Sequence, residues 1–199
     1  METLLLYLID TNEIEIDRLI KSKYISSSML EKLSQIANER VRKEAIASLY
    51  LKNKYIGEYY LNEKGKPLSN NTYFNISHSF GLVLLIKDEK NEIGIDVERI
   101  REVKQKLIDF VCSTKEKSYI KFDQDFYEIW TNKEAISKAE GNGLSTDLKE
   151  ISALPINGIK TYKGKQYLTK TIIKDGYVIS VARESLDDFD IEIINENID

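Results

Sequence analysis

Apolar positions recur with two different periods along the chain, and the change of period marks the expected elements. Residues 4–9 form a continuous apolar run, which is typical of a buried strand. Between residues 29 and 61 apolar side chains return every three or four residues, which predicts a helix. A turn-rich segment at 62–71 follows. Three strands are then predicted at 73–77, 82–86 and 93–98, with "DEKN" at 88–91 as the hairpin turn between the last two.

The second half of the chain repeats the order of helix and then strands. Helical spacing covers residues 103–111, 115–122 and 125–140, and it ends at "GNG". Strands are predicted at 158–162, 167–174 and 177–182, with "KDG" as a tight turn before the last. The tail at 184–199 holds seven acidic residues and no basic residue, so we expect a solvated terminus. This order predicts an α+β fold of two lobes, residues 1–100 and 101–199.

Composition narrows the chemistry that the chain can perform. A net charge of −4 and a pI near 5.3 argue against a nucleic-acid-binding protein, which normally needs a basic face. One histidine and one cysteine exclude a His/Cys zinc site within the chain, so any metal site must be built from oxygen ligands. The lone cysteine can form no intramolecular disulfide, and because the first apolar run is short and follows a glutamate, we expect neither a secretory signal nor a membrane span. We expect a cytoplasmic protein without a membrane partner.

Two carboxylates stand in the strand "EIGIDVERI" at residues 92–100. Asp96 and Glu98 are two positions apart, so on a strand they project from the same face. A divalent cation would relieve their mutual repulsion, and Gly94 would leave room beside the pair. The same alternation also describes the solvated polar face of a half-buried strand. The strand alone leaves both interpretations open.

The predicted helix at 125–140 carries a second charged group. Glu134 and Lys138 lie side by side at the edge of its apolar arc, and Lys133 falls inside that arc. A surface ion pair and a lysine that extends its ammonium to solvent would account for them individually. A lysine within the apolar arc, next to such a pair, is nevertheless unusual.

Four ordered segments together resemble the 4′-phosphopantetheinyl transferases of the surfactin type. They are "GKP" at 65–67, "FNISHS" at 74–79, "GIDVE" at 94–98, and "WTNKEAISK" at 130–138 followed by "GNGLS". The segment "FVCSTKE" at 110–116 keeps a Ser/Glu spacing of the family but lacks its usual aromatic residues. The resemblance implies two similar α+β lobes related by pseudo-twofold symmetry in one monomeric chain. It also implies transfer of the phosphopantetheine arm of coenzyme A to a serine of an acyl or peptidyl carrier protein, with Mg²⁺ as cofactor and release of 3′,5′-ADP.

The resemblance also implies roles for individual residues. Asp96, Glu98 and Glu134 would hold the metal, Glu134 would take the serine proton, and Lys138 would neutralise phosphate charge. Lys133 would support the site. The residues that would bind coenzyme A are Lys66, Ser77, His78, Arg40, Arg42, Lys43 and Ser48. For the basic helix at 40–48, an exposed basic face is an equal alternative.

Two other functions use the same residues. The first is another Mg²⁺-dependent enzyme of phosphoryl or pyrophosphate chemistry, such as a nucleotide or coenzyme A hydrolase. The second is a protein that binds coenzyme A or a carrier without catalysis, although Glu134 and Lys138 speak for an enzyme. A serine hydrolase and a P-loop enzyme lack their motifs in this sequence. The carrier and its pathway are not indicated by the sequence.

Overall fold

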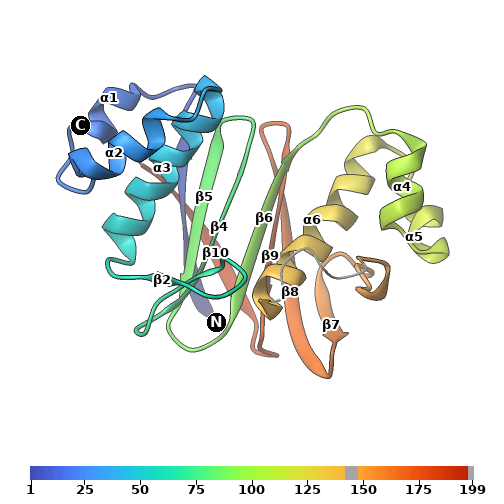
Figure 1. Ribbon diagram of the computed structural model, residues 1–199. Helices are drawn as coiled ribbons and strands as arrows, with labels where there is room; N and C mark the ends of the chain where they lie inside the picture. Colours follow the sequence, from blue (N-terminus) through green and yellow to red (C-terminus); the bar gives the residue numbers. More distant parts are fainter. Residues whose placement is uncertain (142–147, 197–199) are drawn as a thin grey trace.

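Two four-stranded β-sheets lie against each other, and helices cover their outer faces (Figure 1). The computed structural model describes residues 1–141 and 148–196. The first sheet contains, in spatial order, β10 (Phe189–Asn195), β1 (Glu2–Asp10), β5 (Leu82–Asp88) and β4 (Tyr73–Ser79). The second contains β6 (Ile93–Arg99), β9 (Tyr177–Arg183), β8 (Lys165–Lys174) and β7 (Gly158–Tyr162). The α+β class is confirmed.

The alternation of side chains along the strands divides the core into three layers. Leu6 of β1 and Ile95 of β6 belong to a central cluster in which the inner faces of the two sheets meet. Tyr7 and Leu85 face outward from the first sheet and pack with α1 (Ile16–Ile20) and α3 (Glu39–Tyr55). The outer face of the second sheet packs against α4 (Gln105–Val111) and α6 (Asp123–Glu140). The layer order is therefore helix, sheet, sheet, helix.

The helical pattern at 29–61 forms two helices rather than one. α2 (Ser27–Ser34) ends before residue 35, and α3 begins at Glu39 and ends at Tyr55. The side chain of Asn38 accepts a hydrogen bond from the backbone N–H of Val41 at 3.2 Å, so it caps a new helix. Beyond α3, the short strand β2 (Tyr60–Leu61) replaces the end of the expected helix, and β3 (Pro67–Leu68) lies within the turn-rich segment.

The expected hairpin at 88–91 is wrong, because the strands on either side of it belong to different sheets. β5 pairs with β1 and β4, whereas β6 pairs antiparallel with β9. Asp88 accepts hydrogen bonds from the N–H groups of Lys90 and Asn91, and this turn carries the chain from one sheet to the other.

The acidic tail is also not simply solvated. β10 pairs in parallel with β1, and Phe189 at its start is fully buried. At its far end, Glu196 pairs with Lys54 at 2.6 Å. Since β10 lies in the first sheet and β6 in the second, the boundary between the sheets does not follow the expected division at residue 100.

The second half of the described chain supplies the remaining helices. α5 (Thr114–Tyr119) begins with a capping box in which Ser113 and Glu116 bond to each other's backbone, and this uses the Ser/Glu spacing noted in the sequence. Among the described residues, no helix has the length and apolar character needed to span a membrane.

Candidate functional site

The site forms where the edge strands of the two sheets run beside each other. Asn75 and Ser79 of β4 join the backbone of β6 through their side chains. Asn75 Oδ1 accepts from the N–H of Ile95 at 3.1 Å, and Ser79 Oγ accepts from the N–H of Arg99 at 3.3 Å. Polar side chains thus replace a regular backbone ladder along this seam, and they hold the β4 hydroxyls next to the β6 carboxylates.

A glycine allows α6 to approach the same strand closely. A Cβ added at Gly94 would lie 2.0 Å from the carbonyl oxygen of Ala135 and 2.5 Å from the backbone nitrogen of Ala139. Only a residue without a side chain fits between β6 and the helix backbone. Gly94 therefore makes room for α6, not for a metal as expected from the sequence. As a result, Glu134 and Lys138 lie beside Asp96.

Lys138, Asp96 and Ser77 form a compact hydrogen-bonded group. Lys138 Nζ lies 2.7 Å from Asp96 Oδ1 and donates to Ser77 Oγ at 3.0 Å. Ser77 in turn donates to Asp96 Oδ1 at 3.0 Å. Lys138 also donates to the carbonyl oxygen of Ile95 at 3.1 Å. Thus the lysine is paired with the strand carboxylate and not with Glu134 on its own helix.

The other two carboxylates lie close enough to affect each other. Burial, together with the charges of Asp96 and Glu98, raises the pKa of Glu134 to about 7. Burial and the charge of Asp96 also raise the pKa of Glu98, although its Oε2 accepts a hydrogen bond from Ser79 at 2.9 Å. Lys138 and Arg101 act on these carboxylates as opposing positive charges, but the pKa values of Glu98 and Glu134 stay raised because burial and the neighbouring acids outweigh them.

This donor set fits a hard divalent cation that is shared with a phosphate ligand. Asp96 Oδ2 and Glu134 Oε1 are buried and have no hydrogen-bond partner among the described residues. Buried oxygens of this kind are normally satisfied, so their presence points to a ligand. Within 1–141 and 148–196, no three acidic, histidine or cysteine side chains converge as a closed metal cage. Mg²⁺ usually binds through one or two carboxylates plus substrate phosphates, and an open carboxylate set suits that mode.

Lys133 is fully buried, and its ammonium group is held by contacts within the protein. Its Nζ donates to Glu116 Oε2 at 2.7 Å and to the carbonyl oxygens of Val111 at 3.0 Å and Leu148 at 2.9 Å. Although burial opposes it, the pKa of Glu116 is lowered, because Lys133 and the N–H groups of Ala153 and Ser113 donate to the carboxylate. The side chain does not extend to solvent. It ties α6 to α5 and to the segment after residue 147.

Lys66 lies at the C-terminal end of α6. Its Nζ pairs with Glu92 at 3.0 Å and donates to the carbonyl oxygen of Ala139 at 3.4 Å, a favourable place for a cation. Lys66 and Lys138 line one pocket of about 210 Å³, together with Gly65, Ile76 and Gly141. With Lys64, three lysines line this small pocket, which favours an anionic ligand. Of the "GNGLS" segment, residues 142–145 lie outside the described part of the chain.

His78 lines a pocket on the face of β4 opposite to Ser77. Side chains alternate along β4, so Ser77 faces β6 while Ile76 and His78 face α3. His78 and Ser48 line a pocket of about 470 Å³ with two lysines, Lys32 and Lys52. Ile76 lines this pocket and the smaller one, so a single elongated ligand could reach both.

The three basic residues expected at the start of α3 lie apart from these pockets. Arg42 donates to the carbonyl oxygen of Ile36 at 3.0 Å, and Lys43 pairs with Glu39 at 2.8 Å. Arg40 stacks over the ring of Phe80 at 4.5 Å. None of the three lines either described pocket, so a role in ligand binding stays a prediction for them.

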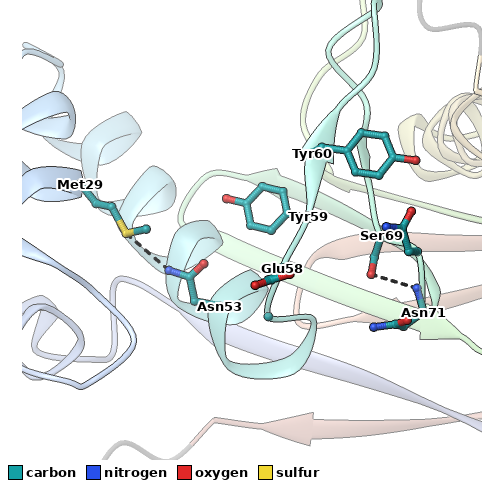
Figure 2. A pocket seen from close by; sticks show the side chains of 9 residues that line it. Met29, Asn53, Glu58, Tyr59, Tyr60, Ser69 and Asn71 are labelled. Carbon is teal, nitrogen blue, oxygen red and sulfur yellow. Dashed lines mark hydrogen bonds between the residues drawn. The ribbon is translucent and has the colours of Figure 1, made fainter.

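A further hollow of about 600 Å³ lies beyond the end of α3 (Figure 2). Tyr59 and Tyr60 border it on one side and Met29 and Asn53 on the other. Asn53 Nδ2 is already used, since it donates to the carbonyl oxygen of Tyr24 at 2.7 Å. Glu58 is the one charged residue among those that line this hollow. The hollow therefore lacks the group of charged side chains that the β4–β6 seam has.

Sequence reasoning missed several members of the site. Asn75 and Ser79 could have been found from the sequence, because polar residues at every second position of "FNISHS" predict a polar strand face. Glu44, which contacts His78, gave no such signal, because it stands in a helix of mixed charges far away in the sequence.

Comparison with known proteins finds a matching family model and several similar chains. Residues 92–191 match the family model of the 4′-phosphopantetheinyl transferase superfamily. The chain is 33% identical over 119 residues to "4′-phosphopantetheinyl transferase ffp" of Bacillus subtilis, covering 55% of this chain and 53% of that protein. It is 31% identical over 140 residues to "4′-phosphopantetheinyl transferase gsp" of Aneurinibacillus migulanus, covering 67% and 54%. A weaker likeness, with a TM-score of 0.36 and 17% identity, joins it to the holo-[acyl-carrier-protein] synthase of Thermotoga maritima, covering 46% and 61%.

The seam of the two sheets and α6 define a carboxylate and lysine site suited to a phosphate ligand. The family match includes β6 and α6, which supply the three carboxylates and Lys138, whereas β4 lies outside the matched residues. The chain belongs to the 4′-phosphopantetheinyl transferase superfamily. The matched regions span about half the length of the curated relatives.

Proposed function

We propose that this protein transfers the 4′-phosphopantetheine arm of coenzyme A to a serine of an apo acyl or peptidyl carrier protein. The observation that carries the proposal is the group formed by Asp96, Lys138 and Ser77 beside the unpartnered oxygen of Glu134. It unites residues from two strands and a helix that the family's motifs supply.

Coenzyme A carries two anionic parts, and the two pockets on either side of Ile76 match them. The pyrophosphate would lie by Lys66 and Lys138, in the smaller pocket that Lys64 also lines. The separate 3′-phosphate would lie by His78 and Ser48 in the larger one. Charge-assisted contacts of this kind are among the stronger polar interactions.

Asp96, Glu98 and Glu134 would hold Mg²⁺ through carboxylate oxygens. When bound, Mg²⁺ neutralises pyrophosphate charge and favours departure of the nucleotide. Glu134 accepts the proton of the carrier serine, whose oxygen forms a bond to the β-phosphorus. The bond from that phosphorus to the bridging oxygen breaks, and 3′,5′-ADP leaves with the electron pair. Lys138 offsets negative charge that develops on the phosphate oxygens.

The test is the intact mass of a carrier protein incubated with this chain, coenzyme A and Mg²⁺. We expect the carrier to gain one phosphopantetheine arm, and we expect EDTA or replacement of the acceptor serine by alanine to prevent the gain. Breakdown of coenzyme A without a change in carrier mass would instead support a pyrophosphate hydrolase. Binding of coenzyme A without turnover would support a silent binder.

Two further properties belong to the same proposal. We expect the chain to act as a monomer, because it carries two sheets that each pack against a long helix within one chain. Light scattering during size exclusion tests this, and a stable dimer or trimer would contradict it. We also expect it to work in the cytoplasm.

A further inference from the structure

Glu44 is a buried acid that the proposed chemistry does not use. It lies on α3, and its side chain is 5% exposed. Glu44 Oε1 accepts a hydrogen bond from the backbone N–H of Gly81 at 2.6 Å, in the turn between β4 and β5. Its Oε2 lies 3.2 Å from His78 Nδ1, and Arg40 Nε lies 3.9 Å from Oε1.

These contacts decide which nitrogen of His78 is available to a ligand. A hydrogen bond at one ring nitrogen fixes the proton there and leaves the other nitrogen for a different partner. Glu44 Oε2 lies 3.2 Å from Nδ1, close enough to attract a proton to that nitrogen, so Nε2 is the nitrogen left for the pocket that the half-exposed imidazole lines. A carboxylate that accepts from an imidazole also holds the orientation of the ring.

The rest of this pocket has the chemistry of a phosphate site. Lys32 and Lys52 line it with the hydroxyl-bearing Ser48. An acid nearby would normally repel a phosphate. The Glu44 carboxylate, however, is directed at Gly81, Arg40 and His78, and it does not line the pocket. Its charge is therefore matched by donors before a ligand arrives.

We propose that Glu44 is a positioning residue that holds His78 with Nδ1–H directed inward and Nε2 presented to a phosphate monoester in the pocket. The identity of that monoester, the 3′-phosphate of coenzyme A, rests on the proposed function. The pairing of Glu44 with His78 does not. Glu44 acts through His78 and touches no reacting atom.

The first test uses the single histidine of the chain, whose ring nitrogens give unambiguous ¹⁵N NMR signals. At pH 8 an ordinary imidazole is neutral, so the tautomer can be identified from the two ¹⁵N shifts. We expect a protonated Nδ1 in the wild-type protein and a loss of this preference in Glu44→Ala. An unprotonated Nδ1 in the folded wild-type protein would overturn the pairing, whatever the ligand is.

The second test compares the binding of coenzyme A and 3′-dephospho-coenzyme A. We expect Glu44→Gln to weaken coenzyme A binding about tenfold, the loss of one charge-assisted contact, and to leave the dephospho compound unaffected. In a His78→Ala background the same substitution should have no further effect on coenzyme A binding. Glu44→Asp should restore part of the affinity.

Glu39→Gln is the matched control, since it is the same substitution on the same helix at a side chain that is 68% exposed. Equal loss for both ligands, or independent effects of Glu44 and His78, would overturn the positioning role. If the wild-type protein binds neither ligand, the assignment of the phosphate fails together with the proposed function. In that case the NMR result still decides the pairing.

Discussion

Glu134 is the residue on which the proposed reaction depends most. Its carboxylate is buried beside two other acids, and one of its oxygens has no partner among the described residues. We expect Glu134→Gln to lower turnover by a factor of about 10²–10⁴, the range for a lost general base. Thermal stability should not fall, because glutamine has nearly the size and shape of glutamate and the substitution removes a buried charge. Full activity, or unfolding, would contradict this.

Lys160 shows how burial affects a cation outside the site. It is 4% exposed, and its hydrogen-bond acceptors among the described residues are neutral: Thr169 Oγ1 at 3.0 Å and the carbonyl oxygen of Gly158 at 3.2 Å. Burial lowers the pKa of Lys160 to about 8. An unfolded lysine keeps its proton to about pH 10.4, so between these values the unfolded state binds more protons and stability rises with pH.

Replacement of this lysine should remove that pH dependence. We expect Lys160→Met to be more stable than the wild-type protein at pH 7, and the difference to shrink between pH 8 and 10. Urea unfolding at a series of pH values measures it. A difference that stays constant across that range would contradict the assignment.

Among the helices and strands, the close packing of α6 on β6 determines where Glu134 and Lys138 lie relative to Asp96. Ala at position 94 would place its Cβ 2.0 Å from a backbone oxygen of the helix, so the helix must move away. We expect Gly94→Ala to destabilise the protein by about 1–3 kcal/mol, as overpacking does, and to reduce activity by displacing Glu134 and Lys138 from Asp96. Urea unfolding and the carrier assay measure the two effects.

Gly164 is a suitable control for this change. Nothing lies within 4 Å of a Cβ added there, and its φ of +77° makes alanine costly only through the backbone. Gly164→Ala should reduce stability but leave the activity of the folded protein unchanged. Equal activity losses in both variants would show that the fit of α6 on β6 is not what matters.

Most elements could be predicted from the sequence, because each depends on local patterns. β7 agrees residue for residue with the alternation at 158–162, and α6 with the helical period at 125–140 to within two residues. Sheet membership could not be predicted. The turn at Asp88 looks like a hairpin turn locally, and only the pairing of β6 with β9 shows that the chain changes sheets there.

In the site, too, the local spacings could be predicted from the sequence and the contacts between distant segments could not. The carboxylate pair of Asp96 and Glu98 and the helix pair of Glu134 and Lys138 were visible as spacings within single segments. The pairing of Lys138 with Asp96, and of Glu44 with His78, depends on contacts between segments distant in sequence. Likewise, the spacing that placed Lys133 in an apolar arc could not show that Glu116 would meet it there.

At the scale of the whole molecule, the C-terminal strand links the two halves of the sequence. β10 crosses back to pair with β1, and Phe189 is fully buried in the central core. We expect Phe189→Ala to cost about 3–5 kcal/mol, as for other buried phenylalanines, in urea unfolding. Leu186→Ala, three residues earlier and 55% exposed, should change stability by less than about 0.5 kcal/mol. Similar small effects for both would contradict a structural role for this strand.

In the proposed reaction at the β4–β6 seam, coenzyme A gives its phosphopantetheine arm to a carrier serine and releases 3′,5′-ADP. Quantifying the released nucleotide and the modified carrier in the same reaction tests it most directly. We expect one mole of 3′,5′-ADP for each mole of carrier modified, at every time point and only with Mg²⁺ present. Nucleotide released in excess of modified carrier, or without any carrier, would contradict it.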